Sequence, residues 1–281
     1  MATAEPNEWM ASTADDWRPP TELNTQVAHP ARVYDWLLGG KDNFPADRVA
    51  GEALVSVRDE ARVAVRANRA VLQRAVRMLA AAGIDQFLDI GTGIPTAGNT
   101  HQVAQGINPR ARVVYVDNDP IVLAHARALM SGAGHGETAV LQADLHDAEG
   151  ILSSPEVRKL IDFGRPVALL LVAVLHFVPD QDNPHAIVAR LLAALPSGSY
   201  LVLTHITNDV LTAKETERVN SAYESVSAPL ALRPKAEILR FFEGLELLAP
   251  GLVLAPWWNP DEEPPQGSDQ IGIYAGVALK P

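Results

Sequence analysis

The 281-residue chain contains no cysteine. Disulfide bonds, thiolate zinc sites and a cysteine nucleophile are therefore excluded. Long apolar runs are also missing, because the longest, residues 167–174, is far shorter than the roughly 20 residues of a membrane-spanning helix. Residues 1–16 are acidic and polar, without the apolar stretch of a signal peptide. We expect a cytoplasmic protein that makes no membrane contact.

Basic residues are outnumbered, with 23 Lys and Arg against 34 Asp and Glu, for a formal net charge of −11. An acidic surface repels phosphate backbones, so we do not expect a nucleic-acid partner. No set of His, Asp and Glu has the spacing of metal ligands, and we expect no metal. The hydrophobic share of 47% is ordinary for a globular protein. The length suits one large α/β domain, alone or with an appended lid.

The first 84 residues predict helices rather than a sheet. Prolines are frequent in residues 1–30, which predicts an irregular N-terminal arm. Residues 31–84 predict an N-terminal helical cap. Its first helix ends at Gly39-Gly40, since glycine readily adopts the left-handed conformation at a helix end. A longer helix is predicted over about residues 46–82.

From residue 85 onward, strands alternate with helices, which indicates an α/β fold with a Rossmann-like, mostly parallel sheet. A helical insertion at about residues 209–244 interrupts the alternation. The last two predicted strands follow one another without a helix, so the sheet should end in an antiparallel strand. We expect residues 85–281 to form one cofactor-binding domain, with the N-terminal helices and the insertion as a lid. The seven predicted strands are residues 86–90, 112–116, 138–142, 166–172, 200–206, 252–254 and 271–279.

A glycine turn follows the first predicted strand, in Asp89-Ile-Gly-Thr-Gly93. Glycines there let the backbone approach a ligand closely. The second strand ends at Asp117, where a carboxylate can accept both hydrogen bonds of a ribose diol. This half-fold predicts an adenosine-type cofactor. The third glycine of the dinucleotide fingerprint is replaced by Thr96, and Pro95 delays the start of the following helix. Both features weaken the prediction of NAD as the cofactor without excluding it.

S-adenosylmethionine suits the pattern better because it carries no phosphate. Asp89, Gly91 and Gly93 suit its amino-acid part, and Asp117, with the adjacent Asn118, suits the ribose. At the end of the third strand, Asp144 can accept from the adenine amine while Leu145 offers an apolar face. Three acids that each follow one of three successive strands are more specific than a glycine pair. They predict a binding site at the carboxyl edge of the sheet.

These features resemble class I S-adenosylmethionine-dependent methyltransferases over about residues 60–281. Residues 29–44, together with Asn68-Arg69, the turn at 89–93 and residues 242–245, resemble a bacterial S-adenosyl methyltransferase family that was long catalogued as a domain of unknown function. This second resemblance covers nearly the whole chain. It implies cofactor binding and does not name a substrate.

Polar residues beside Gly39-Gly40 suggest a segment that closes the site. Tyr34, Lys41 and Asn43 concentrate hydrogen-bonding groups there, and we hypothesise that they fold over the cofactor. Surface structure is the alternative for such a charged helix end.

Two further side chains have a functional and a structural interpretation. Arg69 can grip the cofactor carboxylate in a two-pronged contact, or it is one surface charge on an arginine-rich helix. His176, just after the fourth strand, can serve as a general base, or it is a structural residue of the pocket. His205 is a similar but weaker candidate.

Three functions remain open from the sequence. The first is a methyltransferase acting on a small molecule by in-line transfer, with Tyr223, Phe241 and Phe242 of the insertion covering the substrate. The second is a cofactor-binding regulatory protein without turnover. The third is an NAD-dependent oxidoreductase.

Overall fold

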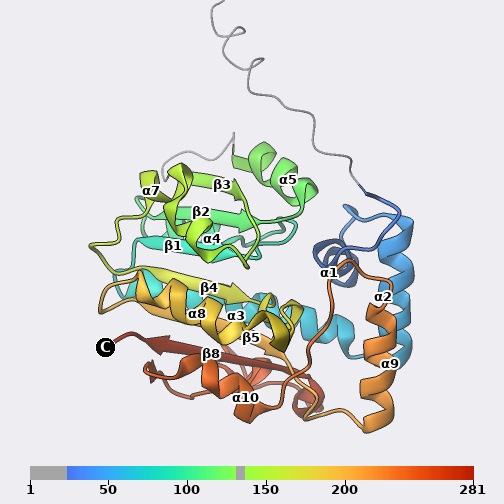
Figure 1. Ribbon diagram of the computed structural model, residues 1–281. Coiled ribbons are helices and arrows are strands. Elements are labelled where there is room, and N and C mark those ends of the chain that lie inside the picture. The colour runs from blue at the N-terminus through green and yellow to red at the C-terminus, as the bar shows by residue number, and fades with distance from the viewer. Residues whose placement is uncertain (1–23, 131–136) are drawn as a thin grey trace, which may run out of the picture.

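A computed structural model describes residues 24–130 and 137–281 of the chain (Figure 1). The predicted N-terminal arm lies outside the described residues except for residues 24–30. The fold is a mixed sheet with helices on both faces, as the alternation of strands and helices predicted. Within the described residues, no helix is long and apolar enough to cross a membrane.

Within residues 24–130 and 137–281, eight strands form the sheet in the order β3-β2-β1-β4-β5-β8-β6, with β7 also paired to β8. The first five strands run parallel, and β8 is antiparallel to β5. The predicted mostly parallel sheet with an antiparallel end is thus confirmed, and a two-residue strand, β6, joins the seven expected strands. The strands are β1 (Gln86–Ile90), β2 (Arg112–Asp117), β3 (Thr138–Gln142), β4 (Ala168–Val172), β5 (Tyr200–Ile206), β6 (Glu246–Leu247), β7 (Val253–Leu254) and β8 (Ile273–Leu279).

Ten α-helices occupy the described residues. Side-chain caps begin some of them: Ser154 and Asn183 each accept from a backbone N–H in the first turn of the helix that follows. The helices are α1 (Pro30–Leu38), α2 (Pro45–Val57), α3 (Ala61–Ala81), α4 (Thr100–Ile107), α5 (Pro120–Met130), α6 (Ala148–Ser153), α7 (Pro155–Leu160), α8 (Pro184–Ala193), α9 (Ala213–Tyr223) and α10 (Lys235–Leu239).

The single long helix predicted over residues 46–82 is wrong. The chain breaks between α2 and α3, where Arg58 adopts an extended backbone with φ −145°. The Arg58 guanidinium binds Glu60 at 3.2 Å and Glu215 at 3.1 Å, and it donates to the backbone oxygens of Val210 and Gln270. These contacts with distant segments outweigh the helix propensity of the local sequence.

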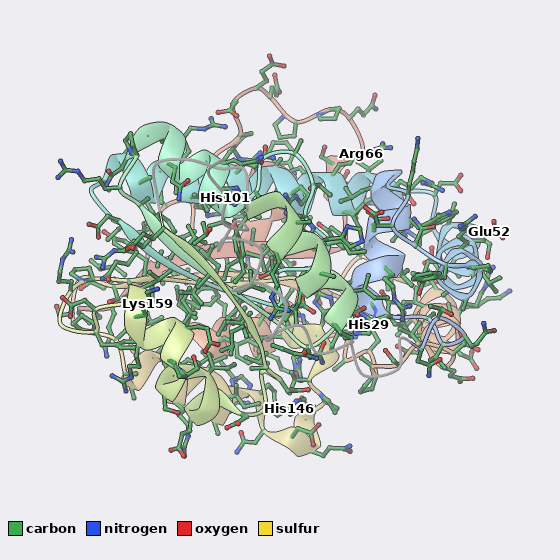
Figure 2. All side chains as sticks on the ribbon, turned by 90° about the horizontal axis from the view of Figure 1, so that it is seen from above. His29, Glu52, Arg66, His101, His146 and Lys159 are labelled. Atoms are coloured by element: carbon green, nitrogen blue, oxygen red, sulfur yellow. The ribbon has the colours of Figure 1, made fainter. Side chains whose placement is uncertain are left out.

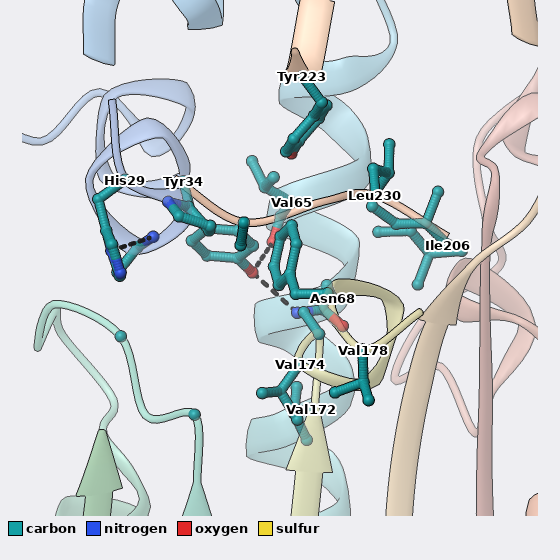
Figure 3. A pocket seen from close by; sticks show the side chains of 18 of the residues that line it. His29, Tyr34, Val65, Asn68, Val172, Val174, Val178, Ile206, Tyr223 and Leu230 are labelled. Atoms are coloured by element: carbon teal, nitrogen blue, oxygen red, sulfur yellow. Dashed lines mark hydrogen bonds between the residues drawn. The ribbon is translucent and has the colours of Figure 1, made fainter. Parts of the chain in front are cut away.

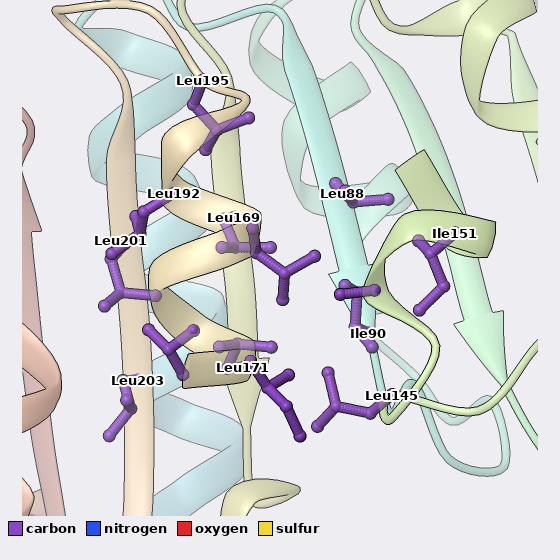
Figure 4. Close-up of a cluster of buried hydrophobic side chains, with 14 of the residues drawn as sticks. Leu88, Ile90, Leu145, Ile151, Leu169, Leu171, Leu192, Leu195, Leu201 and Leu203 are labelled. Carbon is purple, nitrogen blue, oxygen red and sulfur yellow. The ribbon is translucent and has the colours of Figure 1, made fainter. Parts of the chain in front are cut away.

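Two apolar clusters hold the sheet, one on each face. Strand residues alternate between them, so that Leu88 and Ile90 enter one cluster and Phe87 enters the other. Figure 4 shows the first cluster, where leucines of β1, β4 and β5 meet α8 and α6. Phe241 and Phe242 are buried in this cluster, 3% exposed each. The expectation that these two rings cover the substrate is therefore wrong, because they complete the core instead.

A third, smaller cluster joins α1 and α2 to α9, whereas most of α3 packs with the sheet. Figure 1 shows α2 and α9 side by side at one end of the sheet. The segment before α1 also reaches the insertion, because the N–H of Ser227 donates to the oxygen of Ala28 at 2.8 Å. We call α1, α2 and α9 together the lid.

Charged side chains gather on the outside of the molecule. Glu52, Arg66 and Lys159, labelled in the view from above, are all exposed (Figure 2). The polar groups that lie inside the fold are therefore the informative ones.

Candidate functional site

A cavity of about 400 Å³ lies at the carboxyl ends of β1, β2, β3 and β4. Residues of α1, α2, α3 and α9 also line it, so the lid and the sheet enclose it together. Ligands of open parallel sheets bind at this edge. The cavity is lined by nine of the residues expected to hold the cofactor: Tyr34, Arg69, Asp89, Gly91, Gly93, Asp117, Asn118, Asp144 and Leu145.

The glycine turn after β1 needs its glycines. Gly91 and Gly93 have φ of +76° and +68°, a region that other residues rarely adopt. A Cβ on Gly91 would lie 2.5 Å from a methyl group of Val174. The N–H of Gly93 donates to a carboxylate oxygen of Asp117 at 2.8 Å. The turn is thus fixed to the end of β2.

The acids at the ends of β1 and β2 are almost fully buried. Asp89 accepts from the Thr100 hydroxyl at 2.6 Å, and Asp117 accepts from the N–H of Asp119 at 3.0 Å as well as from Gly93. Burial raises the pKa of each carboxyl, to about 6 in both cases. Each of these carboxylates has lone pairs left for a ligand.

The acid at the end of β3 is more open. Asp144 binds His146 at 2.5 Å and accepts from the amide of Asn118 at 3.3 Å. Burial opposes the effect, but the bonds from His146 lower the pKa of Asp144 below its usual value. The other ring nitrogen of His146 lies 3.4 Å from Asp182. No metal site accompanies these acids: among the described residues, no three His, Asp or Glu side chains are grouped to hold a metal ion.

Comparison with known proteins identifies the family of the chain. A sequence profile of the S-adenosyl methyltransferase family matches residues 16–281. The chain belongs to this S-adenosyl methyltransferase family. It is therefore an S-adenosylmethionine-dependent methyltransferase, and S-adenosylmethionine is its cofactor. The predicted resemblance is confirmed, and the oxidoreductase alternative has no support.

Solved structures agree with this assignment. A DUF574 family protein from Streptomyces avermitilis is 47% identical, with a TM-score of 0.88 over 92% of this chain and 100% of that one. A candidate methyltransferase from Thermobifida fusca is 42% identical, with a TM-score of 0.85 over 93% and 98% of the two chains. The magnesium protoporphyrin IX methyltransferase of Synechocystis, solved with bound S-adenosylhomocysteine, shares only the fold, at 14% identity, a TM-score of 0.53 and coverage of 89% and 93%. Curated protein sequences gave no match.

Arg69 of the methyltransferase lies beside the glycine turn. One terminal nitrogen donates to the side-chain oxygen of Asn99 at 3.2 Å, and its Nε has no partner among the described residues. The positive charge of Arg69 partly offsets the effect of burial on the pKa of Asp89. An arginine and a carboxylate therefore face the same part of the cavity.

The polar residues of α1 and of the turn after it do not all line the cavity. Tyr34 lines the cavity, where its hydroxyl donates to the oxygen of Val65 at 2.9 Å and accepts from Asn68 at 2.9 Å (Figure 3). Asn43 does not line the cavity, because its amide binds Asp35 at 2.8 Å and builds the turn. Lys41 is exposed and also lies away from the cavity.

His176 is 2% exposed and does not line the cavity. Burial, with the neighbouring His205 and Arg233, lowers its pKa well below the usual value. Its ring packs against Phe177 and His205, at centroid distances of 4.3 and 5.5 Å. This setting favours the structural interpretation.

Sequence reasoning missed the arginine that organises this region. Arg233 is 1% exposed and donates to the oxygens of Leu175 and Val178, and it binds Asp180 at 2.6 Å. It also contacts the Nε2 of His205 at 2.9 Å. Arg233 thereby joins the insertion to the loop after β4. No local pattern around Pro234 indicates this role.

His29 was also missed, although it begins the segment that carries the family resemblance. It lines the cavity, and its Nδ1 lies 3.1 Å from Asp119, which follows β2. Figure 2 shows it beside α5. The start of the lid thus contacts the segment that follows β2.

Proposed function

We propose that the methyltransferase transfers a methyl group to a small molecule held between the sheet and the lid. One observation carries this proposal: the cavity continues from the acids at the strand ends to apolar side chains under α9, including Val219 and Tyr223. A cofactor-binding protein without turnover needs only the first of these two parts. The proposal includes a cytoplasmic location.

The strand-end part suits the cofactor. Asp117 would hold the ribose, with Asn118 beside it, and Asp144 with Leu145 would hold the adenine. Asp89 and Arg69 would hold the ammonium and carboxylate of the amino-acid part, since their opposite charges match a zwitterion. The bend at Gly91 and Gly93 leaves room for the backbone to approach. Tyr34 would close this part from the lid.

When bound, S-adenosylmethionine would supply a methyl group on a positively charged sulfur. A lone pair of the acceptor would form the new bond to that carbon, and the electron pair of the broken carbon–sulfur bond would stay on sulfur. A hydroxyl or amine acceptor would also lose one proton, which would pass to bulk water when the product is released. The chain's own contribution is to align the acceptor and exclude water, which is how proximity lowers such barriers.

Titration calorimetry tests the cofactor side. We expect S-adenosylmethionine and S-adenosylhomocysteine to bind and NAD to give no heat. Tight NAD binding without binding of S-adenosylhomocysteine would overturn the assignment of these residues.

The acceptor side is tested with S-adenosylmethionine labelled in its methyl group and a bacterial metabolite extract. We expect the label in the low-molecular-weight fraction. Label found only in precipitated protein or nucleic acid would contradict a small-molecule acceptor, and no transfer at all would favour the regulatory alternative. Cell fractionation checks the location.

A further inference from the structure

The lid side of the cavity forms a chamber with its own chemistry. Its walls come from α3, the loop after β4, the end of β5 and the insertion, and the residues are mainly apolar: Val65, Val178, Ile206, Val219 and Leu230. Figure 3 shows these elements around one space. We call this space the acceptor chamber.

Two aromatic rings stand together in the acceptor chamber. Phe177 and Tyr223 both line it, and their ring centroids lie 5.9 Å apart at an interplanar angle of 39°. A third ring that contacts such a pair in an offset or edge-to-face arrangement is bound more favourably than its buried area alone would give. The walls therefore favour a flat, ring-containing ligand over an extended polar one.

The Tyr223 hydroxyl points into this chamber from α9 (Figure 3). No group among the described residues hydrogen-bonds it, whereas the hydroxyl of Tyr34 makes two bonds to its neighbours. Burial raises the pKa of Tyr223 well above its usual value, so the hydroxyl stays neutral. A ligand that hydrogen-bonds this hydroxyl is stabilised, because the described residues give the hydroxyl no other hydrogen-bond partner within the apolar walls.

The positive charge of Arg58, which lines the cavity and contacts the insertion, already has partners. Arg58 lies 3.2 Å from Glu60 and 3.1 Å from Glu215. A charged acceptor would lose its hydration in the chamber without gaining a counter-ion, which is costly. The chamber therefore selects against charge.

We propose that the acceptor chamber binds an uncharged, ring-containing acceptor whose hydroxyl or amine hydrogen-bonds the Tyr223 hydroxyl. Tyr223 is thus a positioning and specificity residue on the lid. The inference rests on the proposed function, since it assumes that the methyl acceptor occupies this chamber while the cofactor occupies the strand ends.

The test uses two probes of one shape in the complex with S-adenosylhomocysteine. 4-Fluorophenol carries the hydroxyl and 4-fluorotoluene lacks it, and fluorine NMR titration gives the Kd of each. The quantity compared is the ratio of the two affinities in the wild type and in Tyr223→Phe, which keeps the ring. A neutral hydrogen bond corresponds to roughly 2- to 12-fold in affinity, so we expect the phenol preference to fall by about that factor.

Tyr200→Phe is the matched control, because Tyr200 lies on β5 and does not line the cavity. It should leave the ratio unchanged. An equal ratio of the two affinities in the wild type and in Tyr223→Phe would overturn the inference. It would also be overturned if the probes bind but shift no resonance of the chamber residues in the protein's own NMR spectrum. 4-Fluorobenzoate, charged at neutral pH, should bind at least tenfold more weakly than 4-fluorophenol, and tighter binding of it would overturn the selection against charge.

Calorimetry with S-adenosylhomocysteine separates the two levels of the proposal. Tyr223→Phe should bind it within about twofold of the wild type, because the strand-end residues are untouched. Failure of S-adenosylhomocysteine to bind any of these proteins would count against the proposed function. Normal binding with an unchanged probe ratio would count against the acceptor chamber alone.

Discussion

Asp117→Asn isolates the residue that we expect to hold the ribose. The carboxylate accepts from Gly93 at 2.8 Å and from Asp119 at 3.0 Å, and it is 7% exposed. Asparagine keeps one acceptor oxygen and places an NH₂ group against the other donor. One buried N–H then loses its partner, at a cost of about 1–3 kcal/mol.

Relief of the buried charge offsets that loss. Burial raises the pKa of Asp117 from 3.8 to about 6, which corresponds to about 3 kcal/mol at neutral pH. Between pH 3.8 and about 6 the folded state binds more protons at this carboxyl than the unfolded state does. The free energy of unfolding therefore falls as pH rises through this range, and the full destabilisation is present above about pH 6. We therefore expect the free energy of unfolding of the ligand-free variant to stay within about 2 kcal/mol of the wild type at pH 7.5.

Cofactor affinity should change much more than stability. A hydrogen bond to a charged group contributes about 1.5–3 kcal/mol, and the variant loses the charge that both ribose hydroxyls would use. We expect a loss of about 2–4 kcal/mol, or roughly 30- to 1000-fold in the Kd of S-adenosylhomocysteine. In the wild type, affinity should also fall as pH drops below 6, where Asp117 becomes protonated. The pH dependence should shrink in the variant without vanishing, because Asp89, with a pKa of about 6, still titrates.

Titration calorimetry between pH 5 and 8, with urea unfolding alongside, measures both quantities. Asp261→Asn is the matched control, since Asp261 is an exposed acid that pairs with Arg77 and does not line the cavity. Equal Kd values for the wild type and Asp117→Asn would refute the ribose assignment. A stability loss above 3 kcal/mol would instead show that the turn, and not the ligand, depends on this carboxylate.

Three further substitutions test how the site is held. Arg233→Met leaves the oxygens of two loop residues unpaired and should lower the free energy of unfolding in urea by about 3 kcal/mol. A decrease of less than about 1 kcal/mol would contradict the role of Arg233 in holding the loop after β4. Gly91→Ala forces a Cβ to 2.5 Å from Val174 at φ +76°. We expect the free energy of unfolding, measured by thermal unfolding, to fall by about 2–4 kcal/mol. The control Gly83→Ala, whose Cβ meets nothing within 4 Å, should lose about 1 kcal/mol. Burial lowers the pKa of His205 to about 3, so only the unfolded state gains its proton as pH falls from 6.5 towards 3 and stability is lost there. His205→Gln should flatten the fall in unfolding free energy between pH 6 and 4, and an unchanged slope would be inconsistent with a neutral buried imidazole.

Local signals predicted the parts of the site that the sheet itself builds. The glycine turn and the acids at 89, 117 and 144 each follow a short apolar strand, and parallel strands bring their carboxyl ends to one edge. Their proximity was therefore a consequence of topology, and it needed no knowledge of long-range packing.

Contacts between distant segments set the rest. The break at Arg58 depends on Glu215, 157 residues away, and the burial of Arg233 depends on loop oxygens 55 and 58 residues away. A helix pattern or a single charge carries no trace of such partners. Asn43 is the opposite case. The sequence suggested that its amide contacts the cofactor, but the amide bonds to Asp35 and Gly40 in the turn that follows α1.

The lid is held by contacts of a different kind from those that hold the strand ends. Its apolar cluster is separate from the two clusters of the sheet. Two polar contacts close it, from His29 to Asp119 at 3.1 Å and from Arg58 to Glu215 at 3.1 Å. A methyltransferase has to exclude water during transfer and then release S-adenosylhomocysteine. A lid with its own small core can open at a lower free-energy cost than the sheet can deform. We therefore expect exchange of the cofactor and the acceptor to require opening of the lid, and hydrogen exchange should be faster in α1, α2 and α9 than in the strands of the sheet.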